Sequence, residues 1–260
     1  MFRWPIIIIL LAVIHSPANA GKLTTTSISK GVEAEDTRAA VSVNGHVFTV
    51  AQVKAVAMRE QGDAVLDRLI DNMLLDQSGQ KIDVSSSRKE VESTWSRLRS
   101  QARIVRNFHA MEPPYSEIAA TVNGIAIPIT AVEAEAMKIA AANVVDRFIN
   151  NELTEQEARR QGIVVTSAEV AAQLETLRKA IAPMTLAEGL KRHHQTIPML
   201  TQDIIHSIQR QKLVEKTTPA PQSAQALIPQ YMEGLRAKAA IVISLNAAQS
   251  SLPAVSSEVR

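Results

Sequence analysis

The sequence repeats part of itself at a fixed offset of 79 residues, and this repeat constrains the fold more than any other feature. Val43-Asn44-Gly45 recurs as Val122-Asn123-Gly124, and residues 65–72 recur as residues 144–151 at the same spacing. One offset shared by separated segments indicates an internal duplication, which has to be settled before individual elements are assigned. Two more pairs keep the offset: Glu90-Val91 with Glu169-Val170, and Leu98-Arg99 with Leu177-Arg178.

The duplication predicts a chain built from two tandem helical copies. The first copy, residues 39–110, is truncated, and the second, residues 116–216, is fuller because it continues into a further pair of helices. Pro113-Pro114 marks the boundary, since proline cannot continue a helix and disfavours helical backbone at the residue before it. Residues 217–226 are expected to form a linker, and residues 227–245 a closing helix and strand.

Each copy is expected to begin with a short strand and a tight Asn-Gly turn. In the first copy, Thr49 and Gln52 form a capping box, Gly62 separates two helices, and Gly79 ends the second of them. The spacing of apolar side chains predicts a third helix over residues 87–107.

The second copy carries three capping boxes, which predict where its helices begin. These boxes start at Thr130, Thr166 and Thr185. A long helix is expected over residues 143–160, with Gly162 as its C-terminal stop.

The closing segment is expected to return to the body of the protein. Its helix carries Pro229 in the first turn, where the missing N–H costs nothing. A β-branched strand follows at residues 241–245. An isolated strand leaves its backbone groups unsatisfied, so we expect this strand to pair near residues 119–122. Residues 246–260 are a polar tail that is expected to be disordered. The predicted fold class is mainly α, with one small strand pair or sheet.

The first twenty residues have the layout of a cleavable secretory signal peptide. Arg3 is followed by an apolar run and then by Ala18-Asn19-Ala20, which predicts cleavage after Ala20. The alternative, a membrane anchor, needs roughly 20 apolar residues, more than residues 4–14 supply. We therefore expect export to the periplasm, a flexible lead-in over residues 21–38, and no membrane span in the mature chain.

The composition excludes several kinds of chemistry. The chain has 28 basic and 26 acidic residues, so its charge gives no reason to expect binding to nucleic acid or to an anionic membrane surface. It has no cysteine, and therefore no disulfide, no thiolate metal ligand and no cysteine nucleophile. We expect no cofactor.

No residue pattern predicts a catalytic or metal site. The sequence has no nucleophile elbow, phosphate-binding glycine loop or zinc-protease helix motif. His193-His194 and His206 form the densest group of histidines, but no cysteine or carboxylate triad joins them, so we interpret them as solvated helix-face residues. Asp67-Arg68 recurs as Asp146-Arg147, and this recurrence favours structural ion pairs over an acid–base pair.

Four apolar residues around two prolines of the second copy are the candidate binding residues: Met184, Ile197, Met199 and Leu200. They flank a break between helices, where apolar surface can stay open to a partner. Methionine side chains adapt to varied partners, which suits a site of broad specificity. The alternative is that these four residues fill the core, as apolar residues at helical spacing commonly do.

The order of these motifs resembles that of the SurA-type periplasmic chaperones and related foldases of Gram-negative bacteria. The resemblance rests on residues 67–75, Gly79-Gln80-Lys81, the link at residues 161–166, Met184-Thr185-Leu186 and the chain end at residues 231–239. It implies a SurA N-terminal-like helical domain, here duplicated, which the returning end of the chain completes.

Family members commonly carry one or two parvulin-type prolyl isomerase domains before the closing helix. Here that position holds only residues 217–226, too few for a folded domain, so the resemblance does not imply isomerase activity. It implies a non-enzymatic, ATP-independent holdase that binds unfolded or partly folded exported polypeptides, including outer-membrane proteins, through apolar helix faces. Two other functions stay open: a dedicated assembly factor with one fixed partner in an envelope or secretion complex, and an enzyme whose site assembles from the scattered histidines. The clients and the oligomeric state are not determined by the sequence.

Overall fold

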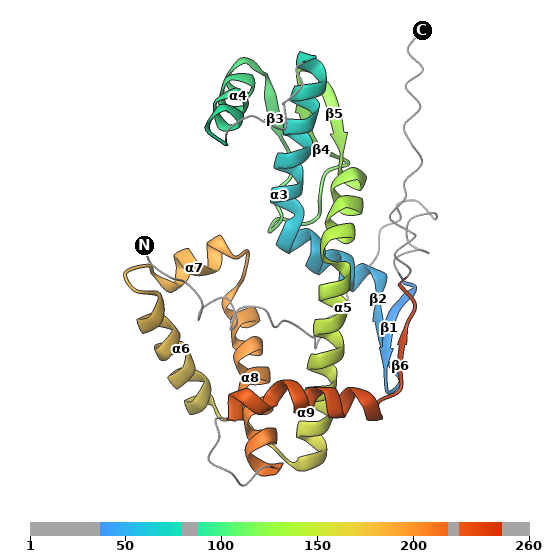
Figure 1. The fold of residues 1–260 in the computed structure, drawn as a ribbon, viewed down its shortest axis with the longest axis vertical. Coiled ribbons are helices and arrows are strands. Elements are labelled where there is room, and N and C mark those ends of the chain that lie inside the picture. Colours follow the sequence, from blue (N-terminus) through green and yellow to red (C-terminus); the bar gives the residue numbers. More distant parts are fainter. Residues whose placement is uncertain (1–36, 80–87, 218–223, 246–260) are drawn as a thin grey trace. The chain divides into compact units, whose positions relative to one another are not determined.

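The computed structural model describes residues 37–79, 88–217 and 224–245 of the 260-residue chain. The predicted signal peptide, nearly all of the predicted lead-in, most of the linker and the C-terminal tail lie outside the described residues. Within the described residues the fold is mainly helical, with two small antiparallel sheets (Figure 1). The chain divides into two compact units, residues 37–51 with 142–245 and residues 52–141, and each unit is described by itself.

The sheet of the first unit has the strand order β2-β1-β6. Strands β1 (Ala39–Val43) and β2 (His46–Thr49) form a hairpin around Asn44 and Gly45. These two residues have φ values of 50° and 88°, the left-handed backbone that an Asn-Gly turn supplies at little cost. Strand β6 (Ile241–Ile243) lies antiparallel to β1 on its other side.

The prediction that the closing strand pairs near residues 119–122 is wrong, because β6 pairs with Val41–Val43 of the first hairpin. The place beside residues 120–122 belongs to strand β3 (Ile104–Arg106). The predicted helix over residues 87–107 is accordingly too long, since α4 (Arg88–Gln101) ends before this strand. The β-branched residues after Gln101 satisfy their backbone groups by pairing with the sheet, which outweighs their apolar helical spacing.

The sheet of the second unit has the strand order β3-β4-β5. Strands β4 (Ile118–Val122) and β5 (Ile125–Pro128) form its hairpin, with φ values of 52° at Asn123 and 87° at Gly124. The register of each hairpin shifts near the start of its first strand, and β1 and β4 have the same order of buried and exposed residues. The two hairpins therefore have the same local structure.

Each hairpin leads into one long, uninterrupted helix, α3 (Val50–Ser78) or α5 (Ile129–Gln161). The predicted break at Gly62 is wrong, and so is the separate helix predicted from residue 143. The C-terminal stops are as predicted, because Gly79 and Gly162 have φ values of 63° and 67°. Gly62 is needed inside α3 for a different reason: a Cβ there would lie 2.7 Å from Cζ of Phe108.

In the first unit, the hairpin packs against the C-terminal half of α5. The Asn44 side-chain amide donates to Oε1 of Gln156 at 2.7 Å, and Nε2 of Gln156 donates to the Val43 carbonyl at 3.4 Å. Phe48 stacks on Phe148, with 4.7 Å between the ring centroids. A hairpin from the first predicted copy is thus held by a helix from the second.

In the second unit, equivalent contacts join its hairpin to α3. The Asn123 amide donates to Oε1 of Gln77 on α3 at 2.6 Å, and Nε2 of Gln77 donates to the Val122 carbonyl at 3.1 Å. The compact units therefore cut across the two predicted copies, because each copy contributes its hairpin to one unit and most of its long helix to the other.

A helix followed by a strand completes each sheet, α4 and β3 in the second unit and α9 (Ala224–Lys238) and β6 in the first. Oδ1 of Asn44 accepts from the Ala240 N–H, and Oδ1 of Asn123 accepts from the Arg103 N–H, both at 2.8 Å. The turn asparagine therefore fixes the residue just before each closing strand. Because α9 begins at Ala224, Pro229 lies inside this helix and not in its first turn as predicted.

The Gly62→Ala variant should be less stable than the natural chain. Phe108 is 1% exposed and lies edge-on to Tyr115, so its ring has little room to retreat from a new Cβ. Alanine gains roughly 1 kcal/mol of helix propensity over glycine, whereas overpacking a core costs about 1–3 kcal/mol. We expect the free energy of unfolding, measured by urea denaturation, to fall by about 1 kcal/mol.

The matched control is Gly234→Ala, which also changes a glycine inside a helix. A Cβ at Gly234 has no neighbouring heavy atom within 4 Å. We expect this variant to be more stable by about 0.5–1 kcal/mol. If both variants gain stability equally, Phe108 does not impose glycine at position 62.

Candidate functional site

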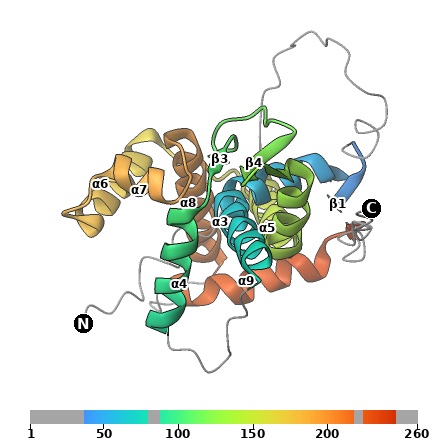
Figure 2. The ribbon, with the colours of Figure 1, turned by 90° about the horizontal axis from the view of Figure 1, so that it is seen from above.

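Three helices in the first unit, α6 (Ser167–Ile181), α7 (Leu186–Arg192) and α8 (Ile197–Thr217), make the first candidate site. Figures 1 and 2 both show α6 and α7 together beside α8. The predicted capping boxes at Thr166 and Thr185 are confirmed, with Glu169 and Glu188 bonded back to the cap residues. Each helix start is therefore fixed locally, independently of how much of the helix is buried.

The apolar side chains of α6 that pack against α8 are only partly buried. Leu200, Ile204 and Ile208 of α8 are buried, and a set of half-buried side chains packs against them. No residue of α6 is fully buried, although the helix is amphipathic along its whole length. The apolar stripe, the name used here for this half-buried set, consists of Val165, Val170, Leu174, Leu177, Leu186 and Leu190.

The four predicted binding residues lie in this region but do not form one open surface. Met199 and Leu200 are 8% and 4% exposed, so they belong to the packed part of α8. Met184 is half-buried and its Cε lies against buried Gly189, whereas Ile197 is 48% exposed. Binding by these residues stays a prediction. The sequence did not single out the stripe along α6 and α7.

The opposite face of α8 is buried and polar, which the sequence analysis missed. His206 is fully buried, so its interpretation as a solvated residue is wrong, and it lies 2.7 Å from Oε1 of Glu155 on α5. That hydrogen bond holds the pKa of Glu155 below its ordinary value, against the opposing effect of burial. The spacing of Asp203, His206 and Arg210 puts them on one helix face, and this spacing was the available signal in the sequence.

The recurrent Asp-Arg pairs do take part in ion pairs, but the partners come from other elements. Oδ1 of Asp67 accepts from Arg106 of β3 at 2.6 Å. Oδ1 of Asp146 accepts from Arg236 of α9 at 3.2 Å, and Arg68 pairs with Glu135 at 2.7 Å. The first two contacts tie the closing elements β3 and α9 to the long helices, and the third joins α3 to α5.

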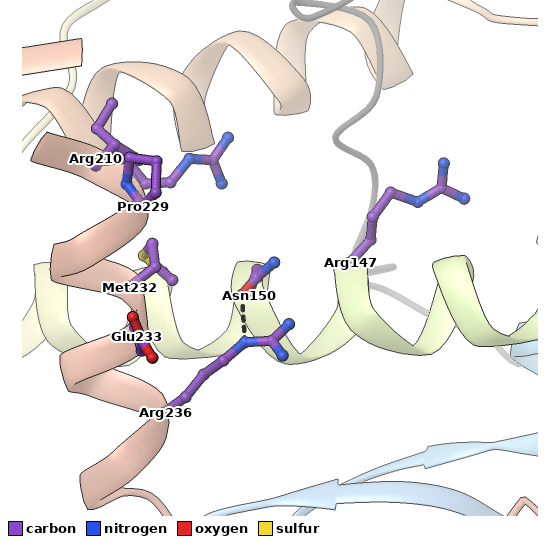
Figure 3. A pocket seen from close by; sticks show the side chains of 8 residues that line it. Arg147, Asn150, Arg210, Pro229, Met232, Glu233 and Arg236 are labelled. Atoms are coloured by element: carbon purple, nitrogen blue, oxygen red, sulfur yellow. Dashed lines mark hydrogen bonds between the residues drawn. The ribbon is translucent and has the colours of Figure 1, made fainter. Parts of the chain in front are cut away.

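A pocket of about 480 Å³ in the first unit is the second candidate site, here called the arginine pocket. It lies between α5, α8 and α9, and Figure 3 shows its side chains. Three guanidinium groups and one carboxylate line it together with an apolar wall. The lining residues are Arg147, Asn150, Arg210, Ile228, Pro229, Met232, Glu233 and Arg236.

Neither metal ligation nor membrane insertion finds support in the described residues. Within them, no three histidine, aspartate or glutamate side chains are grouped to hold a metal ion. His193 ends α7 as its C-cap, and His194 has a left-handed φ of 51°. None of the helices in the described ranges is both long enough and apolar enough to cross a bilayer.

Comparisons with protein-family models, with curated proteins and with solved structures found no match to this chain.

Acid should weaken the fold partly through Glu155. Because its native pKa is lowered, the group stabilises the protein fully above the pKa it has when unfolded, and this contribution is lost as the pH falls through the lower native value. We expect the free energy of unfolding to fall as the pH drops below the ordinary pKa of a glutamate, and Glu155→Gln to make this fall less steep. Urea denaturation at a series of pH values measures the slope.

Glu175→Gln is the control for this experiment. The substitution changes the net charge equally, but the Glu175 side chain is half exposed and its ion pairs among the described residues are with exposed Arg178 and Lys179 of its own helix. We expect its slope to match that of the natural chain. A Glu155→Gln slope as steep as the control would contradict a role for the His206 contact.

Proposed function

We propose that this protein is a non-enzymatic, ATP-independent holdase of the periplasm. It binds unfolded or partly folded exported polypeptides, including outer-membrane proteins, and prevents their aggregation. The single observation that carries the proposal is the apolar stripe along α6 and α7, whose side chains are all half-buried. Helix α6, which carries three of them, has no fully buried residue.

A half-covered stripe suits weak binding of many sequences. Burying apolar surface yields about 25 cal/mol per Å² and requires no particular partner geometry. The leucine and valine side chains of the stripe still have accessible area to lose when an apolar segment of a client lies against them. The polar residues between them on α6 keep the unoccupied surface soluble.

The resemblance to SurA-type chaperones supports the same proposal. That resemblance implies a chain end that returns to complete the N-terminal domain, and β6 does pair with β1 of the first hairpin. It also implies that, without an isomerase domain at residues 217–226, the helical part acts by holding clients. Family membership itself is part of the proposal, because its basis is the order of short motifs.

We further propose that the two hairpin-and-helix segments arose by tandem duplication. The supporting observation is that the same asparagine–glutamine contact occurs twice, at positions separated by the 79-residue offset of the sequence repeat. Asn44 with Gln156 and Asn123 with Gln77 make the same side-chain bonds, and each residue of one pair is 79 positions from its counterpart.

A holdase should protect several unrelated clients from aggregation. We expect the purified chain, mixed with several urea-unfolded outer-membrane proteins on dilution, to lower light scattering for most of them without ATP. Protection of one client alone would favour a dedicated assembly factor, and protection of none would contradict the holdase proposal.

Polar substitution of the stripe should reduce this protection. Leu174→Gln with Leu177→Gln removes apolar area from the face that remains accessible and should raise the chain concentration needed for half-protection about threefold or more. Ala172→Gln, at an exposed position of the same helix, is the matched control and should leave protection unchanged. Circular dichroism checks that all variants are equally helical, and equal protection by the stripe variant and the control would exclude the stripe as the binding surface.

A further inference from the structure

The arginine pocket contains a buried cation with few acceptors around it. Arg210 is 8% exposed, and burial lowers the pKa of its guanidinium to about 10. In the part of the chain that the structure describes, its hydrogen bonding consists of one 3.4 Å contact, from Nη1 to Oδ1 of Asn151. Asp203 attracts it through space. A guanidinium has five N–H donors, and burying it with so few acceptors costs free energy that a bound anion would recover.

Asn150 supplies a second donor to the same space. Its Oδ1 accepts from Nε of Arg236 at 2.9 Å, so the amide nitrogen is left to donate. Figure 3 shows this nitrogen on the side of Asn150 away from the bond to Arg236, and Asn150 and Arg210 both line the pocket. Nη2 of Arg236 in turn donates to Asp146 at 3.2 Å. Arg236 is therefore engaged and positions Asn150, while Arg210 and Asn150 can bind an anion together.

Part of the pocket lining is apolar. Ile228, Pro229 and Met232 of α9 form it, and Met232 is 7% exposed. Proline contributes no N–H donor to this part. Glu233 adds a negative charge to the lining, which disfavours ligands with several negative charges. The ligand that fits carries one negative charge at one end and an apolar body at the other.

We infer that the arginine pocket binds a monocarboxylate with an apolar body, either as a free acid or as the C-terminal residue of a polypeptide. The carboxylate accepts hydrogen bonds from Arg210 and from the Asn150 amide, since charge-assisted bonds to arginine are the strong ones. The apolar body packs on Ile228, Pro229 and Met232. A volume of about 480 Å³ suits a ligand of one or two amino-acid residues. This site is separate from the apolar stripe and does not depend on the holdase proposal.

Calorimetric titration of the whole chain with N-acetyl-leucine and with N-acetyl-leucinamide tests the charge requirement. The two compounds share the apolar body, so we expect the acid to bind and the amide to bind about tenfold or more weakly, the loss that follows from removing a hydrogen-bonded charge. Inorganic phosphate, which has no apolar body, should bind more weakly than the acid. Equal binding of acid and amide, no detectable heat with either, or tighter binding of phosphate would overturn the assignment.

A pair of short peptides distinguishes the two sources of the carboxylate. A peptide ending in leucine with a free C-terminus is compared with the same peptide carrying a C-terminal amide. Binding of the free acid peptide supports recognition of polypeptide ends. Binding of N-acetyl-leucine without either peptide assigns the pocket to free carboxylic acids.

Two substitutions with opposite expected effects locate the ligand. Arg210→Gln should lower the affinity for N-acetyl-leucine about tenfold or more, and Glu233→Gln should raise it severalfold by removing a like charge. Arg192→Gln, at an exposed position of α7, is the control and should change nothing. If Arg210→Gln fails to fold, the result for Glu233→Gln decides alone, and unchanged affinity in Glu233→Gln or in folded Arg210→Gln would overturn the proposal.

Discussion

A two-stranded hairpin is at best marginally stable in water, and each hairpin of this protein is completed by a third strand from outside the hairpin. In the first unit that strand is β6, and in the second it is β3. The same asparagine that makes the tight turn also accepts a hydrogen bond from the residue before the third strand. Turn, register and closure are therefore set by one side chain in each sheet.

Each long helix has to be continuous, because the hairpin that packs near its C-terminal end is not the hairpin that leads into it. Gln156 near the end of α5 binds the first hairpin through Asn44. Gln77 near the end of α3 binds the second hairpin through Asn123. A break at Gly62 would separate the start of α3 from the part that carries Gln77. Glycine is kept at that position by the ring of Phe108 and not by any need for a helix end.

The first unit contains the features to which a function can be assigned. Helix α8 is buried on two sides of different character, apolar toward α6 and α7 and polar toward α5. Because the first side is covered only partly, it leaves apolar area for a partner. The side of α8 that faces α5 is polar, and together with α9 it lines the arginine pocket. The packing of α8 thus accounts both for the burial of Arg210 and for the partial burial of the apolar stripe.

The sequence by itself determined part of the local structure. The Asn-Gly turns, the capping boxes at Thr166 and Thr185 and the glycine stops at Gly79 and Gly162 were all predictable, because neighbouring residues decide each of them. The mainly helical class followed from the same signals.

Only the tertiary structure decided which segments meet. That β6 pairs with the first hairpin, that residues 104–106 form a strand and that Gly62 lies inside a helix all depend on contacts between residues far apart in the chain. The 79-residue spacing does not tell which of the two long helices holds a given hairpin. The same holds for the candidate sites: the spacing of Asp203, His206 and Arg210 defines a face of α8, but whether α5 covers that face or water does is settled by packing alone.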